Sequence, residues 1–147
     1  MFKHILIPID GSEFSDRVID LGVCFAKSLH ARVTGFIAEP DYMLPSYGEL
    51  IQSQGESMDD YAARARRHAE SVLQRIEARA SAEGVVFDSA FVQSDHPVQA
   101  IAAAADEHGC DLIVMVSHGR RGLDKLIHGS VAQALIAHTK VPVLVLH

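Results

Sequence analysis

The chain has 147 residues, of which 48% are hydrophobic, and a formal net charge of −6 at pH 7. This length is enough for one compact core and short for two, so we expect a single domain over residues 1–147. The acidic charge balance argues against a nucleic-acid partner, and no apolar run approaches the ~20 residues of a membrane-spanning helix. Residues 1–8 enter a strand and show no signal-peptide cleavage region, which predicts a cytoplasmic protein.

Strand and helix patterns alternate along the chain. The first strand, residues 3–10, leads into a helix that opens at Ser12 and carries an apolar stripe of Phe14, Val18, Leu21, Phe25 and Leu29. The later patterns predict, in chain order, a strand at 31–38, a loop at 39–56, a helix at 57–83, a strand at 85–93, a helix at 95–108, a strand at 111–116, a helix at about 129–138 and a strand at 141–146. The loop at 39–56 is longer than most connections, which is typical of a functional or mobile segment.

Most of the predicted strands are continuously apolar, which is typical of a parallel sheet covered by helices on both faces. We therefore expect an α/β fold with a doubly wound, open, Rossmann-like parallel sheet of five strands. In such sheets ligands bind at the carboxyl ends of strands, where the strand order reverses. The loops after residues 10 and 116 both leave carboxyl ends, and they form one crevice if their strands are neighbours.

The cysteines and histidines do not indicate a metal centre or a disulfide. Cys24 lies in a helical pattern and Cys110 just before a strand, so both are expected to be buried or half-buried thiols. The nine histidines are scattered, and none makes an HxH or His-x-x-x-His pair with a nearby acid, so no metal site is predicted. A divalent ion such as Mg²⁺ could still accompany the phosphates of a bound nucleotide.

The most informative segment joins the fourth strand to the last helix. It reads Val116-Ser117-His118-Gly119-Arg120-Arg121-Gly122, and the helix after it opens with Gly129-Ser130. Glycines let a backbone approach an anion closely, and the N–H groups and positive dipole end of a helix attract one. Walker-A and Gly-x-Gly-x-x-Gly fingerprints are both absent, so the segment indicates a phosphate site of another kind. His118 and the two arginines either act on phosphates or are an ordinary loop histidine and solvent-exposed arginines, and both interpretations stay open.

Over essentially its whole length the chain resembles the universal stress protein family, which has an adenine-nucleotide alpha-hydrolase-like fold. The resemblance rests on Ile5-Leu6-Ile7-Pro8-Ile9-Asp10-Gly11-Ser12, Ser117-His118-Gly119, Gly129-Ser130 and Val141-Pro142-Val143-Leu144-Val145. Nucleotide-binding members carry a glycine, two residues, a second glycine, nine residues and then Gly-Ser or Gly-Thr. Here Gly119 is the second glycine and Gly129-Ser130 follow nine residues later, whereas Val116 occupies the position of the first.

The resemblance implies an ATP site, with no catalytic residue assigned. It would place the phosphates by Gly119, Gly129, Ser130 and Val131, with Arg120 a candidate to neutralise them, the adenine by Asp10 and Ala38 with Pro8 and Ile9 nearby, and the ribose by Met115 and Val116. Most of the phosphate donors would be backbone groups beyond Val116. We therefore expect this valine to weaken nucleotide binding without abolishing it.

The function that the resemblance implies is that of a small ATP-binding stress-response protein. It would act through nucleotide-dependent conformation or contact with a partner protein, and it would form a homodimer through the last strand, residues 141–146. Three alternatives stay open: a slow ATPase, a pocket for AMP or cyclic AMP, and a dimeric interaction module whose pocket is vestigial. Any catalysis is expected to be at most slow hydrolysis of ATP.

Overall fold

The computed structural model describes residues 1–9, 15–41, 57–116 and 129–146. Its elements are β1 (His4–Ile9), α1 (Ser15–Leu29), β2 (Arg32–Glu39), α3 (Met58–Ala82), β3 (Phe87–Gln93), α4 (Pro97–Glu107), β4 (Leu112–Val116), α5 (Gly129–His138) and β5 (Val143–Leu146). The strands form one five-stranded sheet in the order β3-β2-β1-β4-β5, and every neighbouring pair is parallel. The α/β fold and the five-stranded parallel sheet expected from the sequence are confirmed.

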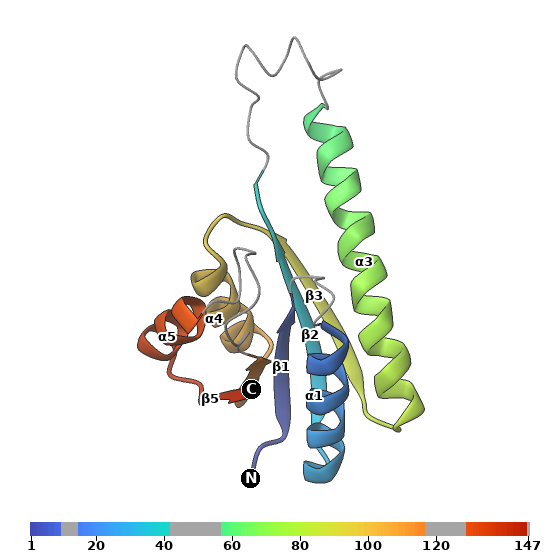
Figure 1. Cartoon of the computed structure of the whole chain (residues 1–147), viewed down its shortest axis with the longest axis vertical. Coiled ribbons are helices and arrows are strands. Elements are labelled where there is room, and N and C mark those ends of the chain that lie inside the picture. Colours follow the sequence, from blue (N-terminus) through green and yellow to red (C-terminus); the bar gives the residue numbers. More distant parts are fainter. Residues whose placement is uncertain (10–14, 42–56, 117–128, 147) are drawn as a thin grey trace.

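Helices cover both faces of the sheet (Figure 1). On one face α1 and α3 enclose an apolar cluster with the β1 side chains of Ile5, Ile7 and Ile9. On the other face α4 and α5 enclose a second cluster around Leu6 and Met115. All six residues of β1 are buried, because this central strand has a neighbour on each edge and a helix layer on each face.

The helix α1 packs on the sheet through most of the stripe that the sequence predicts, since Val18 is buried and Phe25 and Leu29 pack against the core, but Leu21 departs from it. Val18, Val23 and Ala26 are buried, whereas Leu21, which belongs to the predicted stripe, is 40% exposed. The reason is the close approach of the helix to β1 at Gly22, where a Cβ atom would lie 2.6 Å from Ile7 Cδ1. The glycine therefore faces the sheet, and Leu21 is turned away from it.

The orientation of α1, with Gly22 toward the sheet, also determines whether Cys24 is buried. Cys24 is exposed, so the prediction that it is buried or half-buried is wrong, whereas Cys110 is buried as expected. The Cys24 sulfur lies 3.7 Å from the guanidinium of Arg79 in α3.

Among the helices that the structure describes, none has the length and the apolar character that crossing a membrane requires.

Candidate functional site at the carboxyl ends of the central strands

The carboxyl ends of β1 and β4 lie side by side at the centre of the sheet. β1 pairs with β2 on one edge and with β4 on the other, where Ile5 lies opposite Leu112. Counted along both strands, this register matches Ile9, the last residue of β1, with Val116, the last residue of β4. After β1 the chain crosses to α1 on one face, and after β4 it crosses to α5 on the other (Figure 1). The strand order therefore reverses here, which is where open α/β sheets bind ligands.

Pro8 interrupts the ladder between β1 and β4 close to this point. The N–H of Asp111 donates to the carbonyl of His4 (2.9 Å), so His4, Leu6 and Pro8 direct their backbone polar groups toward β4. A proline has no N–H to donate. Among the described residues, pairing of β1 with β4 extends no further than Leu6, whereas pairing with β2 continues to Ile9. The seam between the two strands is thus least tightly hydrogen-bonded next to the switch point.

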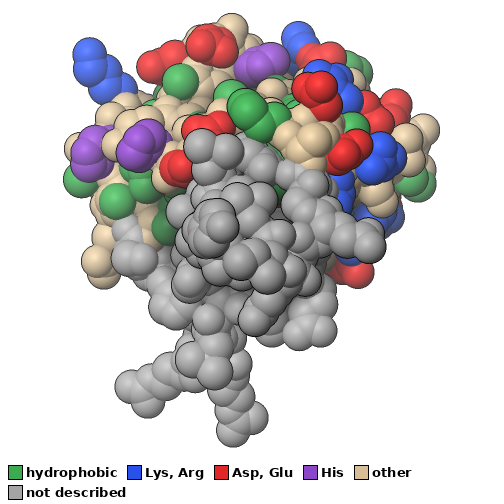
Figure 2. Space-filling view, turned by 90° about the horizontal axis from the view of Figure 1, so that it is seen from above, with side chains coloured by type: hydrophobic (Ala, Val, Ile, Leu, Met, Phe, Trp, Pro, Cys, Tyr) green, Lys and Arg blue, Asp and Glu red, His purple; other side chains and the backbone are tan. Residues whose placement is uncertain are grey.

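Three helices begin at this edge of the sheet. α1 follows β1, α4 follows β3 and α5 follows β4, and their lengths are 15, 11 and 10 residues. In a parallel sheet each such helix directs its amino terminus, with its free N–H groups and positive dipole end, to the carboxyl edge of the strands. In Figure 2, which looks onto this end from above, charged side chains of both signs and histidines lie mainly across the upper half of the view. The edge thus combines a switch point with several partial positive charges, an arrangement suited to an anion.

The predicted site residues fall into two groups. Asp10, Gly119 and Arg120 lie outside the described residues. The others all lie at or next to this edge: Pro8, Ile9, Ala38, Met115, Val116, Gly129, Ser130 and Val131. The helix α5 begins at Gly129, as the sequence predicts, so the backbone of Gly129 and Ser130 forms its first turn.

The predicted site residues differ in how deeply their side chains are buried. Ile9 and Met115 are 6% and 1% exposed, and their side chains belong to the two core clusters. At these two positions the backbone, and not the side chain, is available to a ligand. Ala38 and Val131 are half-buried and lie at the border of the second cluster.

Sequence reasoning missed a group of polar contacts at the end of β2. Glu39 is hydrogen-bonded to the imidazole of His68 in α3, and the hydroxyl of Tyr61 donates to the carbonyl of Pro40 (2.8 Å). The N–H of Asp41 donates to the carboxylate of Asp95 (2.9 Å). These contacts tie the start of the following segment to α3 and to the β3–α4 connection. The acidic residue that ends an apolar strand, Glu39, was the available signal. Among the described residues, no cluster of metal-ligating side chains is present.

The model of the "Universal stress protein family" matches residues 1–147. Among curated relatives, a universal stress protein of Thermus aquaticus is 33% identical over 98% of this chain and 98% of its own length. A universal stress protein of Methanocaldococcus jannaschii is 28% identical over 99% of this chain and 82% of its own length.

Solved structures of the same family share the fold. The structure of a family member from Burkholderia pseudomallei has a TM-score of 0.70 and 27% identity, with coverage of 99% of this chain and 96% of that one. Two more distant structures were solved with adenine nucleotides. One is a universal stress protein in complex with cAMP (TM-score 0.67, 23% identity, 99% and 97% coverage), and the other is a universal stress protein of Archaeoglobus fulgidus in complex with dAMP (0.60, 20%, 100% and 98%).

Proposed function

Because this chain belongs to the universal stress protein family, we propose that it is a stress-response regulatory protein that binds ATP at the carboxyl ends of β1 and β4. The nucleotide would control its conformation or its contact with a partner protein. The observation that carries the proposal is the position of the α5 amino terminus, Gly129-Ser130, at the switch point of the sheet. The cytoplasmic location expected from the sequence is part of the same proposal.

The residues at this edge have the chemistry that a nucleotide site requires. The first N–H groups of α5 would hold the phosphates, and the backbone of Pro8, Ile9 and Ala38 would border the adenine, with Asp10 beside them. The backbone of Met115 and Val116 would border the ribose. Gly119 and Arg120 would complete the phosphate-binding loop, and a bound Mg²⁺ would neutralise part of the phosphate charge.

Thermal unfolding tests this proposal. Protein stripped of ligand is heated with and without ATP and Mg²⁺ at millimolar concentration. Binding to the folded state alone at ~100 times Kd stabilises it by about 2.7 kcal/mol, which raises Tm by several degrees. We expect Gly129→Val to remove this rise, because a branched side chain would occupy the space by the phosphates. The control is Gln133→Val, which places a valine at an exposed position of the same helix and should leave the rise intact.

A Tm that no adenine nucleotide changes would contradict ATP binding and favour the interaction module with a vestigial pocket. AMP and cAMP belong in the same series, because structures of family members have been solved in complex with cAMP and dAMP. A larger rise with either mononucleotide than with ATP would make that nucleotide the ligand. Turnover of ATP well above the protein-free rate would favour the slow ATPase instead.

A substitution of Val116 tests directly whether this side chain weakens ATP binding. This valine stands where nucleotide-binding relatives carry the first glycine of the motif, and it ends β4. If its branched side chain weakens binding, Val116→Gly increases the rise of Tm that ATP produces, although the apo variant is less stable because a glycine in a strand costs backbone entropy. An equal or smaller rise in the variant would show that Val116 does not hinder the nucleotide.

The proposal includes a homodimer that forms through β5. This strand lies at the edge of the sheet, and its four residues, Val143 to Leu146, are all only half-buried. An apolar edge strand with unpaired backbone groups favours pairing with a second chain. In such a homodimer the sheets of the two subunits would join into one continuous sheet.

A further inference from the structure

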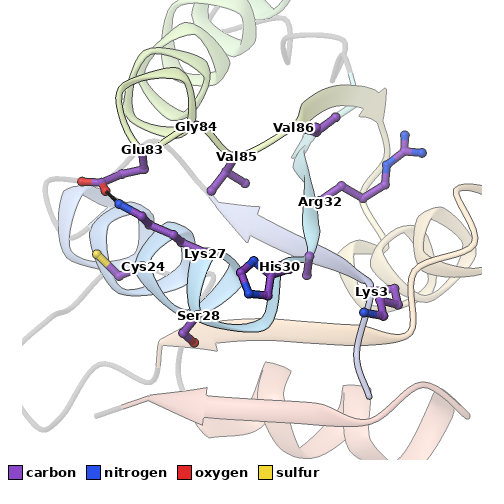
Figure 3. Close-up of a pocket in the computed structure, with 11 residues that line it drawn as sticks. Lys3, Cys24, Lys27, Ser28, His30, Arg32, Glu83, Gly84, Val85 and Val86 are labelled. Atoms are coloured by element: carbon purple, nitrogen blue, oxygen red, sulfur yellow. Dashed lines mark hydrogen bonds and ion pairs between the residues drawn. The ribbon is translucent and has the colours of Figure 1, made fainter.

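A second concave site lies at the amino end of the sheet, opposite the proposed nucleotide site. It is a cavity of about 840 Å³ between the ends of α1 and α3 and the starts of the first three strands. Its lining includes Lys3, Lys27, His30, Arg32, Val85 and Val86 (Figure 3). A volume of this size lies within the range of pockets that bind small molecules.

The charges of the lining favour an anion, although the whole chain has a net charge of −6. Three lining residues are cationic, Lys3, Lys27 and Arg32, and one is acidic, Glu83. Lys27 is paired with Glu83 (2.7 Å), and Arg32 is paired with Asp88 outside the pocket. The ammonium group of Lys3 forms no ion pair with any residue that the structure describes. In Figure 3, Lys3 and the Lys27–Glu83 pair lie on opposite sides of the pocket, with His30 between them.

Helix carboxyl ends normally repel anions through their free carbonyl groups. Here both helix ends are closed by the chain itself. The last carbonyls of α1 accept hydrogen bonds from the N–H groups of His30 and Ala31, and those of α3 accept from Gly84 and Val85. His30 adopts a left-handed conformation (φ 52°) to close its turn. The repulsion is thereby reduced where the cationic side chains are.

The pocket also has an apolar side. Ala31 and Val85 are buried in its wall, and Val86 is 66% exposed in the connection that enters β3. An exposed valine beside cationic groups gives the pocket one surface for hydrocarbon and another for charge. A purely inorganic anion would leave the apolar surface uncovered.

We propose that this amino-end pocket is a second ligand site, for a small organic anion that has a carboxylate or phosphate head on a short apolar body. The head pairs with Lys3 and lies near His30, and the body covers Val85 and Val86. This site is separate from the nucleotide site, since the two lie at opposite ends of the strands.

Cys24 is a built-in reporter for the test, because it is exposed in the pocket wall. The second thiol, Cys110, is buried, and burial raises its pKa to about 11, so it does not compete for an alkylating reagent in the folded protein. The rate of Cys24 alkylation by iodoacetamide is measured by mass spectrometry at constant ionic strength. The probes are hexyl phosphate and hexanoate, with hexanol and inorganic phosphate as controls that lack the charge or the apolar body.

We expect hexyl phosphate or hexanoate to slow alkylation in a saturable way, and neither control to do so. The more protective of the two anions identifies the head group. Lys3→Gln should weaken the apparent affinity roughly three- to tenfold, as expected for loss of one charge-assisted contact. Arg67→Gln removes one exposed positive charge about 24 Å along α3 from Glu83 and should have no effect. Val86→Ser should also weaken protection, and circular dichroism checks that each variant is folded.

Several outcomes would overturn the proposal. Equal protection by hexanol would indicate an apolar groove without anion recognition, and equal protection by inorganic phosphate would indicate charge attraction alone. Undiminished protection of Lys3→Gln, or no protection by either organic anion, would exclude the site. ATP should not protect Cys24, so these results do not depend on whether the nucleotide proposal holds.

Discussion

His4 and Thr34 are polar side chains that lie inside the sheet, 7% and 0% exposed. The imidazole Nε2 of His4 and the hydroxyl of Thr34 are hydrogen-bonded at 2.7 Å. Burial lowers the pKa of His4 below 6.5, and the positive charge of Arg32 lowers it further, whereas Asp111 acts in the opposite direction. The folded protein therefore favours the neutral imidazole more strongly than the unfolded chain does.

This environment predicts a dependence of stability on pH. Since the unfolded chain takes up the proton more readily, the contribution of His4 is complete above pH 6.5 and is lost as the pH falls below that value. Urea unfolding between pH 7.5 and pH 5, compared between the natural protein and His4→Gln, isolates this residue from the other eight histidines. The variant should lose less free energy of unfolding over this range. Parallel curves would refute the assignment.

At the level of elements, α3 depends on a strand residue for its close packing. Its buried side includes Ala65, Ala69 and Ile76, and it rests on β2 at Gly35. A Cβ atom at Gly35 would lie 2.8 Å from Ile76 Cδ1 and 3.1 Å from Leu73 Cδ2. The missing side chain thus sets the distance between the longest helix and the sheet.

Gly35→Ala should therefore destabilise the fold by about 1–3 kcal/mol, the usual cost of overpacking a core. Chemical denaturation measures the free energy of unfolding. Ser89→Ala is the matched control, because Ser89 is the register partner of Gly35 in β3 but is exposed, and it should change stability by less than ~0.5 kcal/mol. A similar small effect of both variants would mean that the side-chain ends of Leu73 and Ile76 move aside at little cost.

The solvent-facing side of α3 has a second role that its charge pattern did not reveal. Arg75 and Arg79 on this side pair with Asp16 and Asp20 of α1. Hydrogen bonds from Lys27 and Arg79 lower the pKa of Glu83. These pairs align the two helices side by side on one face of the sheet. They arise from residues 59 positions apart, so no local pattern announces them.

At the level of the whole molecule, β5 is the last strand of the sheet and has no further strand beside it among the described residues, which is a structural basis for the proposed homodimer. The N–H of Ile113 donates to the carbonyl of Pro142 (2.9 Å), so alternate residues from Pro142 onward face β4, and the backbone groups of Val143 and Val145 face outward. Val145→Pro would remove an outward N–H without touching the ladder to β4. Sedimentation velocity should then show monomers, whereas Val145→Thr should remain dimeric. A monomeric natural protein, or a dimeric proline variant, would contradict pairing through this edge.

The sequence alone was sufficient for the succession of elements and for the class of the fold. Continuous apolar runs marked the buried strands, and the described part of α5 starts at Gly129, where the sequence predicts a helix from about residue 129. Element ends were less certain: β3 and β5 begin two residues later than expected, at Phe87 and Val143. Val86 explains the first shift, since it is apolar but exposed in the connection before the strand.

Only the tertiary structure decided which residues far apart in sequence become neighbours. It placed β4 beside β1, and so made one edge from Ile9 and Val116. It turned Cys24 outward, and it assembled the amino-end pocket from the starts of three strands and the ends of two helices. Hydrophobic periodicity is a local property. It predicts that a side chain is buried, but it does not identify the element that the side chain packs against. Strand order and helix rotation depend on how whole elements fit together, as at Gly22 and Gly35, where the absence of a side chain brings a helix and a strand into contact.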